Sequence, residues 1–227
     1  HPEQKRQWCL GDLSATFLAQ METVLHTYSL PYNPKRPVLC FDERPCFLIG
    51  DVLQPLPMSK GQSQREDYQY EKHGSCCVLL AFEPHTGRRW LKVYTQRTAK
   101  EYTHFMRYLT GQFPNAESIT LVQDNLNTHH PGSFYSQLDP HKAFALAQRF
   151  TWIYTPKHAS WLNMVELEFS ALARQCLNRR ISSQALLEKE TLAWAKARNK
   201  AQVKVSWQFS IQTARTKLHR HYKSART

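Results

Sequence analysis

The stretch Val38-Leu-Cys-Phe-Asp42-Glu43 is a short apolar run that closes on two acidic residues. Such a run is typical of a buried β-strand, and a second run of the same kind, Ile119-Thr-Leu-Val-Gln-Asp124, also ends on an acid. Acidic residues at the carboxyl ends of strands lie where chains leave the core of an open α/β sheet and where ligand sites form. If the two strands are parallel neighbours, Asp42 and Asp124 meet at one edge of the sheet.

Three further strands are predicted around these two. Cys76–Phe82 and Trp90–Thr95 are joined by a turn that contains Pro84 and Gly87, which favours an antiparallel hairpin, and Phe150–Tyr154 reads as a fifth strand. Helices are expected at 98–110, about 133–149, 160–178, 183–199 and 211–222. This order predicts an α/β fold, with a mixed sheet of three antiparallel strands plus parallel strands, covered by helices on both faces.

Residues 1–37 are expected to precede the main domain as a helix followed by a linker. Apolar residues at helical spacing run from Leu13 to Tyr28, and a Pro-rich stretch reaches Pro37. Residues 38–227 then form one large domain with basic C-terminal helices and a long loop or loosely paired ribbon at 51–74. Because the first residue is not Met, we expect a fragment of a longer protein.

The composition indicates a globular protein with a polyanionic partner. Lys and Arg number 30 against 18 Asp and Glu, a net charge of +12, and nine basic but no acidic residues lie between Lys196 and the C-terminus. This asymmetry favours nucleic acid, with a solvated basic tail as the alternative. No stretch approaches the roughly 18 apolar residues that span a membrane, and no secretion signal is present. Six cysteines without a CxxC pair or regular spacing favour a reducing cytoplasm over a zinc site or disulfides.

A third acidic residue, Glu166, comes from the predicted helix at 160–178. Its side chain lies at the edge of the apolar stripe that includes Leu162, Val165 and Phe169, so it is expected to point toward the sheet. The neighbouring acids Glu43 and Glu168 are turned away by strand and helix geometry and are not assigned to the site. The alternative for Glu166 is a surface side chain that reaches water.

Divalent metal ions explain why three such acids would be gathered. Carboxylates within a few Å of one another repel and take up protons, whereas Mg²⁺ or Mn²⁺ prefers oxygen ligands and neutralises them. Two such ions roughly 3.5–4 Å apart can activate a water or a 3′-hydroxyl and stabilise the leaving oxygen of a phosphodiester. We therefore predict two ions per active site, and phosphoryl transfer catalysed by Asp42, Asp124 and Glu166.

Three blocks resemble the signature of mariner-type insertion-sequence transposases, the bacterial branch of the DDE superfamily. They are Phe41–Glu43, Val122–His129 and Tyr154–Glu166, and the resemblance runs in order over about residues 38–222. It implies a ribonuclease H-like fold in which the family's Asp, Asp and Glu positions are occupied by Asp42, Asp124 and Glu166.

The resemblance also implies an activity, which is cleavage at transposon ends followed by transfer of the 3′-hydroxyl into target DNA. The implied partners are double-stranded DNA, namely terminal inverted repeats and a TA-containing target, and a second copy of the chain, in the bacterial nucleoid. Such transposases carry N-terminal helix-turn-helix modules, for which residues 1–37 leave no room, and the 41 residues between Asp124 and Glu166 exceed the usual mariner spacing. Alternatives are a catalytically silent DNA-binding relic and a nuclease of the same fold that cuts without joining.

Further residues are expected to support catalysis or to contact DNA. Asn125 and His129 could orient the carboxylate of Asp124 or contact a phosphate. For Trp161 a packing role fits equally well, and one of the arginines, Arg174, could pair with Glu168 instead. The predicted DNA-binding residues are Lys157, His158, Trp161, Arg174, Arg179, Arg180, Lys60 and Arg65.

Overall fold

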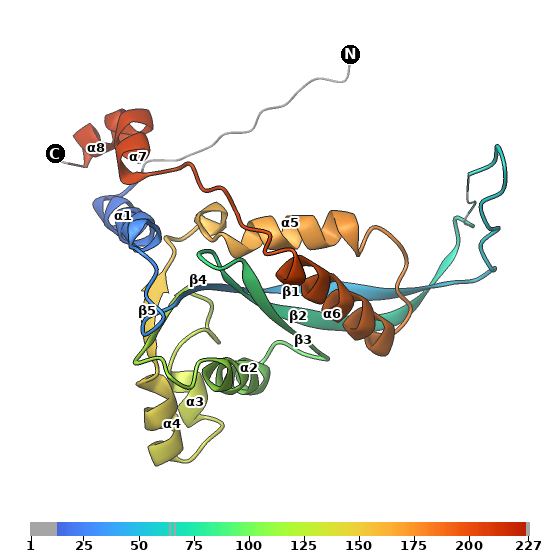
Figure 1. Cartoon of the computed structure of the whole chain (residues 1–227), viewed down its shortest axis with the longest axis horizontal. Helices are drawn as coiled ribbons and strands as arrows, with labels where there is room; N and C mark the ends of the chain where they lie inside the picture. The colour runs from blue at the N-terminus through green and yellow to red at the C-terminus, as the bar shows by residue number, and fades with distance from the viewer. Residues whose placement is uncertain (1–12, 64, 66, 226–227) are drawn as a thin grey trace.

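A computed structural model describes residues 13–63, 65 and 67–225 of the protein, which build a mixed five-stranded sheet (Figure 1). The order across the sheet is β3-β2-β1-β4-β5; β2 is antiparallel to β1 and β3, whereas β4 is parallel to β1 and β5. The predicted α/β fold is therefore confirmed. The strands are β1 (Val38–Asp51), β2 (Tyr70–Glu83), β3 (Arg88–Tyr94), β4 (Ile119–Gln123) and β5 (Phe150–Tyr154).

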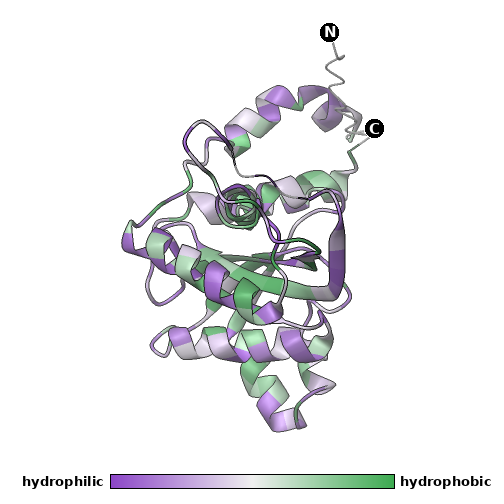
Figure 2. Ribbon diagram, turned by 90° about the vertical axis from the view of Figure 1, so that its right-hand side faces the viewer, coloured by the Kyte–Doolittle hydropathy of each residue, from purple (hydrophilic) through white to green (hydrophobic). Residues whose placement is uncertain are grey.

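Helices cover both faces of the sheet, and the strands form a mainly hydrophobic layer between them (Figures 1 and 2). The helices on one face are α1 (Ala15–Ser29), α5 (Val165–Gln175) and α6 (Gln184–Lys200), and those on the other are α2 (Ala99–Gln112), α3 (Gly132–Tyr135) and α4 (Pro140–Ala147). Two short helices follow near the C-terminus, α7 (Ile211–Lys217) and α8 (His219–Ser224).

The alternation of side chains along β1 feeds two separate hydrophobic cores. Val38 and Cys40 belong to the core under α1, α5 and α6, whereas Leu39 and Phe41 belong to the core under α2, α3 and α4. Both sets are buried because successive residues of a strand point to opposite faces. By the same alternation Asp42 belongs to the α5 face and Glu43 to the α2 face.

Three predicted helices differ from the structure, and the first, expected at about 133–149, is divided into α3 and α4. Helix α5 begins at Val165 and not at 160, because the Asn163 side chain donates to the Phe41 carbonyl; residues 160–162 form a 3₁₀ turn. The expected last helix is divided at Leu218 into α7 and α8. Strands β1 and β2 continue as a ribbon that projects from the body (Figure 1), so of the two alternatives for 51–74 the loosely paired ribbon is the one found.

Helix α1 shares the core of the sheet. Met21 and Val24 are fully buried in the cluster that holds Val38 and Cys40, and the Tyr28 hydroxyl donates to the carbonyl of Leu162 at 2.9 Å. The helix is therefore part of the same packed body as β1, while the division of the chain after residue 37 stays a prediction. Among the described residues, no helix is long and apolar enough to cross a membrane.

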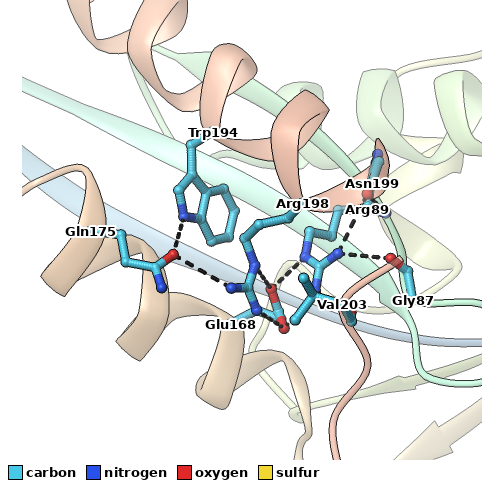
Figure 3. A network of polar contacts seen from close by, with 8 residues as sticks. All are labelled: Gly87, Arg89, Glu168, Gln175, Trp194, Arg198, Asn199 and Val203. Carbon is cyan, nitrogen blue, oxygen red and sulfur yellow. Dashed lines mark hydrogen bonds and ion pairs between the residues drawn. The ribbon is translucent and has the colours of Figure 1, made fainter. Parts of the chain in front are cut away.

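A buried ion-pair cluster joins α5, β3 and α6 (Figure 3). Glu168 is only 1% exposed; its Oε1 accepts from Arg89 at 2.8 Å and from Arg198 at 3.0 Å, and Arg89 also donates to the carbonyl of Val203. Glu168 is thus buried in this cluster and paired with arginines, which its position outside the apolar stripe of the helix did not reveal. Helix α6 packs against α5 and covers Glu168, so this side chain does not face water. Arg174, the alternative partner considered for Glu168, is exposed.

Candidate active site

The parallel pairing of β1 with β4 places two of the three predicted acids side by side. Val38 pairs with Thr120 and Cys40 with Val122, and the same offset continued by two residues brings Asp124 level with Asp42. The ladder ends before that level, because the carbonyl of Phe41 accepts instead from Nδ2 of Asn163 at 2.8 Å. Asp42 therefore stands where β1 leaves the parallel ladder, although β1 itself continues to Asp51, and Asp124 directly follows the last residue of β4.

Glu166 joins these two acids from the first turn of α5. Asp42 is 8% exposed, and burial first, then the charges of Glu43, Asp124 and Glu166, raise its pKa to about 8. Burial also raises the pKa of the half-buried Glu166, with Asp124 adding to the shift and Arg44 opposing it. The three carboxylates thus lie close enough to repel one another.

His129 binds Asp124 from the loop that follows β4. Its Nδ1 lies 2.5 Å from Oδ1 of Asp124, and its Nε2 lies 2.8 Å from Oε2 of Glu43. Burial tends to lower the pKa of His129, but the hydrogen bond to Asp124 and the close contact and charge of Glu43 outweigh it and raise the pKa to about 9. Burial tends to raise the pKa of Asp124, but the contact with His129 outweighs it, and the pKa is lowered. The imidazole is therefore a cation held between two acids.

The carboxylates suit a divalent cation in kind but are not yet gathered around one position. Oxygen donors are the ligands that Mg²⁺ and Mn²⁺ prefer, and the raised pKa of Asp42 reflects a repulsion that a cation would relieve. Within residues 13–225, positions 64 and 66 excepted, no group of three His, Cys, Asp or Glu side chains is arranged to hold a metal ion. Metal binding would therefore require side-chain rotation.

A cavity of about 500 Å³ opens beside Asp124, and several predicted residues line it. Asn125, Lys157 and His158 lie on its wall, and His158 has a φ of 63°, a left-handed conformation that non-glycine residues seldom adopt. Trp161 is 40% exposed and packs edge-on against Phe209 at 5.5 Å between ring centroids. The structure thus brings Asn125, Lys157 and His158 to the acid, whereas Trp161 has a packing partner.

The remaining predicted DNA contacts lie apart from this cavity. Arg180 donates to Asp51 at 2.7 Å and to the carbonyl of Gln69 at 3.0 Å, so it anchors the ribbon. Arg179 pairs with Glu190, and Arg174 is exposed at the end of α5. Lys60 and Arg65 are exposed near the tip of the ribbon.

Two residues near the acids were not predicted to belong to the site: Glu43 was set aside as turned away, and Arg44 was not considered. The side chain of Glu43 is buried against His129, and its Oε1 lies 3.6 Å from Nη1 of Arg97. Arg44 lies on the same face of β1 as Asp42, and its charge opposes the rise in the pKa of Glu166. Strand alternation gave the face of Glu43, but only the path of the loop after β4 shows what meets it.

The mixed sheet and the acids at its carboxyl edge define the ribonuclease H-like class. Residues 37–188, more than half of the chain, match the family described as DDE superfamily endonuclease, and the chain belongs to this family. No curated protein matches it.

Solved structures of the Mos1 mariner system have a similar fold. The paired end complex with Mn is 12% identical, with 99% of this chain and 67% of that chain covered and a TM-score of 0.57. The Strand Transfer Complex is 11% identical, with 100% and 66% covered and a TM-score of 0.58. At these identities the likeness is one of fold, and the chain spans about two thirds of the length of those proteins.

The metal-free protein is expected to lose stability as the pH rises from 6.5 to about 9. The pKa of His129 is raised from 6.5 to about 9, so its stabilising contacts are complete below 6.5 and are lost as the pH passes 9. The raised pKa of Asp42 acts in the same direction up to pH 8. Urea unfolding in EDTA should show a midpoint that falls over this range, and falls less in His129→Gln. A midpoint that rises would contradict the assignment.

Proposed function

We propose that the chain is the catalytic domain of a mariner-type transposase, which cleaves DNA at transposon ends and joins the exposed 3′-hydroxyl to target DNA. The observation that carries the proposal is the alignment of Asp42 with Asp124 on neighbouring parallel strands, with Glu166 entering from α5. In a chain of the DDE superfamily endonuclease family, this arrangement supports phosphodiester chemistry.

Asp42, Asp124 and Glu166 are proposed to hold two divalent cations, Mg²⁺ or Mn²⁺. Bound there, the ions supply charge stabilisation for the attacking and leaving oxygens of the phosphodiester. The chain's own part is to hold the carboxylates at a half-buried edge that limits access of water, while Asn125, Lys157 and His158 line the adjacent cavity. Lys157 supplies a positive charge for a DNA phosphate at that wall.

A strand-transfer assay separates joining from cutting. The chain is incubated with Mn²⁺, a supercoiled TA-containing plasmid, and labelled duplexes with a free 3′-hydroxyl. The duplex ends are taken from the inverted repeats that flank the coding sequence of the chain. We expect the labelled duplex to become covalently joined to the plasmid. Cleavage of uncut ends without any joined product would favour the nuclease alternative, and DNA binding with neither product would favour the silent relic.

The same material tests the proposed partners. Sedimentation of the chain with a transposon-end duplex should give a species that contains two copies of the chain. The basic run toward the C-terminus is only partly free for DNA, since Arg198 pairs with Glu168 and Arg215 with Glu22. DNA binding is therefore expected to depend more on Lys157 than on these two arginines, as gel shifts of Lys157→Gln and Arg215→Gln would show.

A further inference from the structure

Glu43 lies on the opposite face of β1 from Asp42 and still connects to the active site. Its side chain is buried, and Oε2 lies 2.8 Å from Nε2 of His129, an ion-pair contact whose alignment falls short of a hydrogen bond. The other ring nitrogen of His129 lies 2.5 Å from Oδ1 of Asp124. Two adjacent residues of β1 thus belong to the same site: Asp42 directly, and Glu43 through the imidazole of His129.

The imidazole between the two acids is clamped on every side that the contacts describe. Its ring stacks on Tyr102 with centroids 5.1 Å apart and meets the ring of Phe41 edge-on at 5.2 Å. Its backbone carbonyl accepts from Nε2 of Gln123 at 2.7 Å, and Oε1 of that side chain accepts from the Tyr102 hydroxyl at 2.9 Å. The ring is therefore fixed in place between the carboxylates of Glu43 and Asp124.

We infer that Glu43 is a positioning residue that acts through His129 to fix the carboxylate of Asp124. The inference rests on the proposed function, because it supposes that Asp124 binds a divalent cation. Oδ1 of Asp124 accepts from His129 and from the backbone of Leu126, so Oδ2 is the oxygen that these contacts leave for the cation.

The physical reason is the cost of a loosely held ligand. A carboxylate that is free to rotate loses entropy when it binds a metal, whereas one already fixed by a partner does not. Partners that orient metal ligands typically contribute about 10- to 100-fold to metal affinity or activity. Glu43 holds His129 aligned, because a ring with a carboxylate at each nitrogen is held against turning away from Asp124.

Calorimetry with Mn²⁺ on the whole chain tests the inference without relying on catalysis. Glu43→Gln keeps the shape of the side chain and removes its charge, and we expect about 10-fold weaker Mn²⁺ binding. The matched control is Glu117→Gln, which alters an exposed pair with Arg36 far from the site and should leave the affinity unchanged. If Glu43→Gln does not fold, Glu43→Asp takes its place in the experiment, because the shorter side chain keeps the charge but moves it away from His129. Unchanged affinity in the folded variant would overturn the inference.

A double-mutant cycle distinguishes positioning through His129 from a general structural effect. In a His129→Gln background, Glu43→Gln should weaken Mn²⁺ binding by less than about twofold, because the connecting ring is already lost. Equal effects in both backgrounds would overturn the inference.

Failure of the proposed function remains distinguishable from failure of this inference. If the unaltered chain binds no Mn²⁺, the proposed function fails, and the crystal structure of metal-free Glu43→Gln then decides the inference. The carboxylate of Asp124 is expected to leave Nδ1 of His129 in that structure, whereas an unchanged contact would overturn the positioning role.

Discussion

Replacing Asp42 or Asp124 by Asn, or Glu166 by Gln, is expected to lower Mn²⁺-dependent DNA cleavage by at least about 10³-fold. Each substitution removes a negative charge that the proposed cations need, while the size of the side chain stays the same. Loss of several kcal/mol of transition-state stabilisation corresponds to a rate loss of about this size. Single-turnover cleavage of a transposon-end duplex measures it.

Two controls keep this result specific to the site. Gel shifts should show that DNA binding by the three variants is largely intact, because none of the acids is expected to hold DNA directly. Glu117→Gln, which alters an exposed acid paired with Arg36, should cleave at the rate of the unaltered chain. A variant of the three that still cleaves would remove that residue from the catalytic assignment.

The largest expected effect on stability comes from Glu168. Replacing it by Leu leaves the guanidinium of Arg89, which is fully buried, without its carboxylate partner, and also removes a partner of Arg198. Breaking a buried ion pair from one side typically costs about 3–5 kcal/mol of unfolding free energy. Urea unfolding of the metal-free chain should therefore show a loss of this size.

The double variant Glu168→Leu with Arg89→Met provides the internal comparison. A buried pair replaced by apolar groups is often close to neutral, so the second substitution should restore part of the loss, with Arg198 still lacking its partner. A loss below about 1 kcal/mol in Glu168→Leu alone is what exposed pairs give, and it would contradict the buried cluster.

Most of the fold could be predicted from periodicity and turn residues. Apolar runs located every strand of the sheet, and Thr98 with Glu101 predicted the capping box that begins α2. The ribbon was less visible, because β1 and β2 pair there through exposed polar side chains and no hydrophobic face marks the strands. The start of α5 was misplaced because a tertiary contact of Asn163 overrides the local helical pattern.

The site could be predicted only in part, for reasons of the same kind. The prediction that Asp42 and Asp124 adjoin rested on parallel neighbours sharing an edge, and the parallel pairing is confirmed, but β1 does not end at Asp42 as expected and continues to Asp51. Helix angle alone could not predict the surroundings of Glu168, because it does not reveal whether α5 faces water or another helix. Nor could alternation along β1 predict that His129 returns to meet Glu43, a contact between residues far apart in the chain.

A crystal of the chain soaked in Mn²⁺ and examined for anomalous scattering tests the central claim most directly. We expect Mn²⁺ peaks between the carboxylates of Asp42, Asp124 and Glu166, with these side chains rotated toward the metal. Peaks elsewhere only, or none at a Mn²⁺ concentration well above the affinity measured in solution, would contradict the claim that these three acids form a metal-dependent catalytic centre.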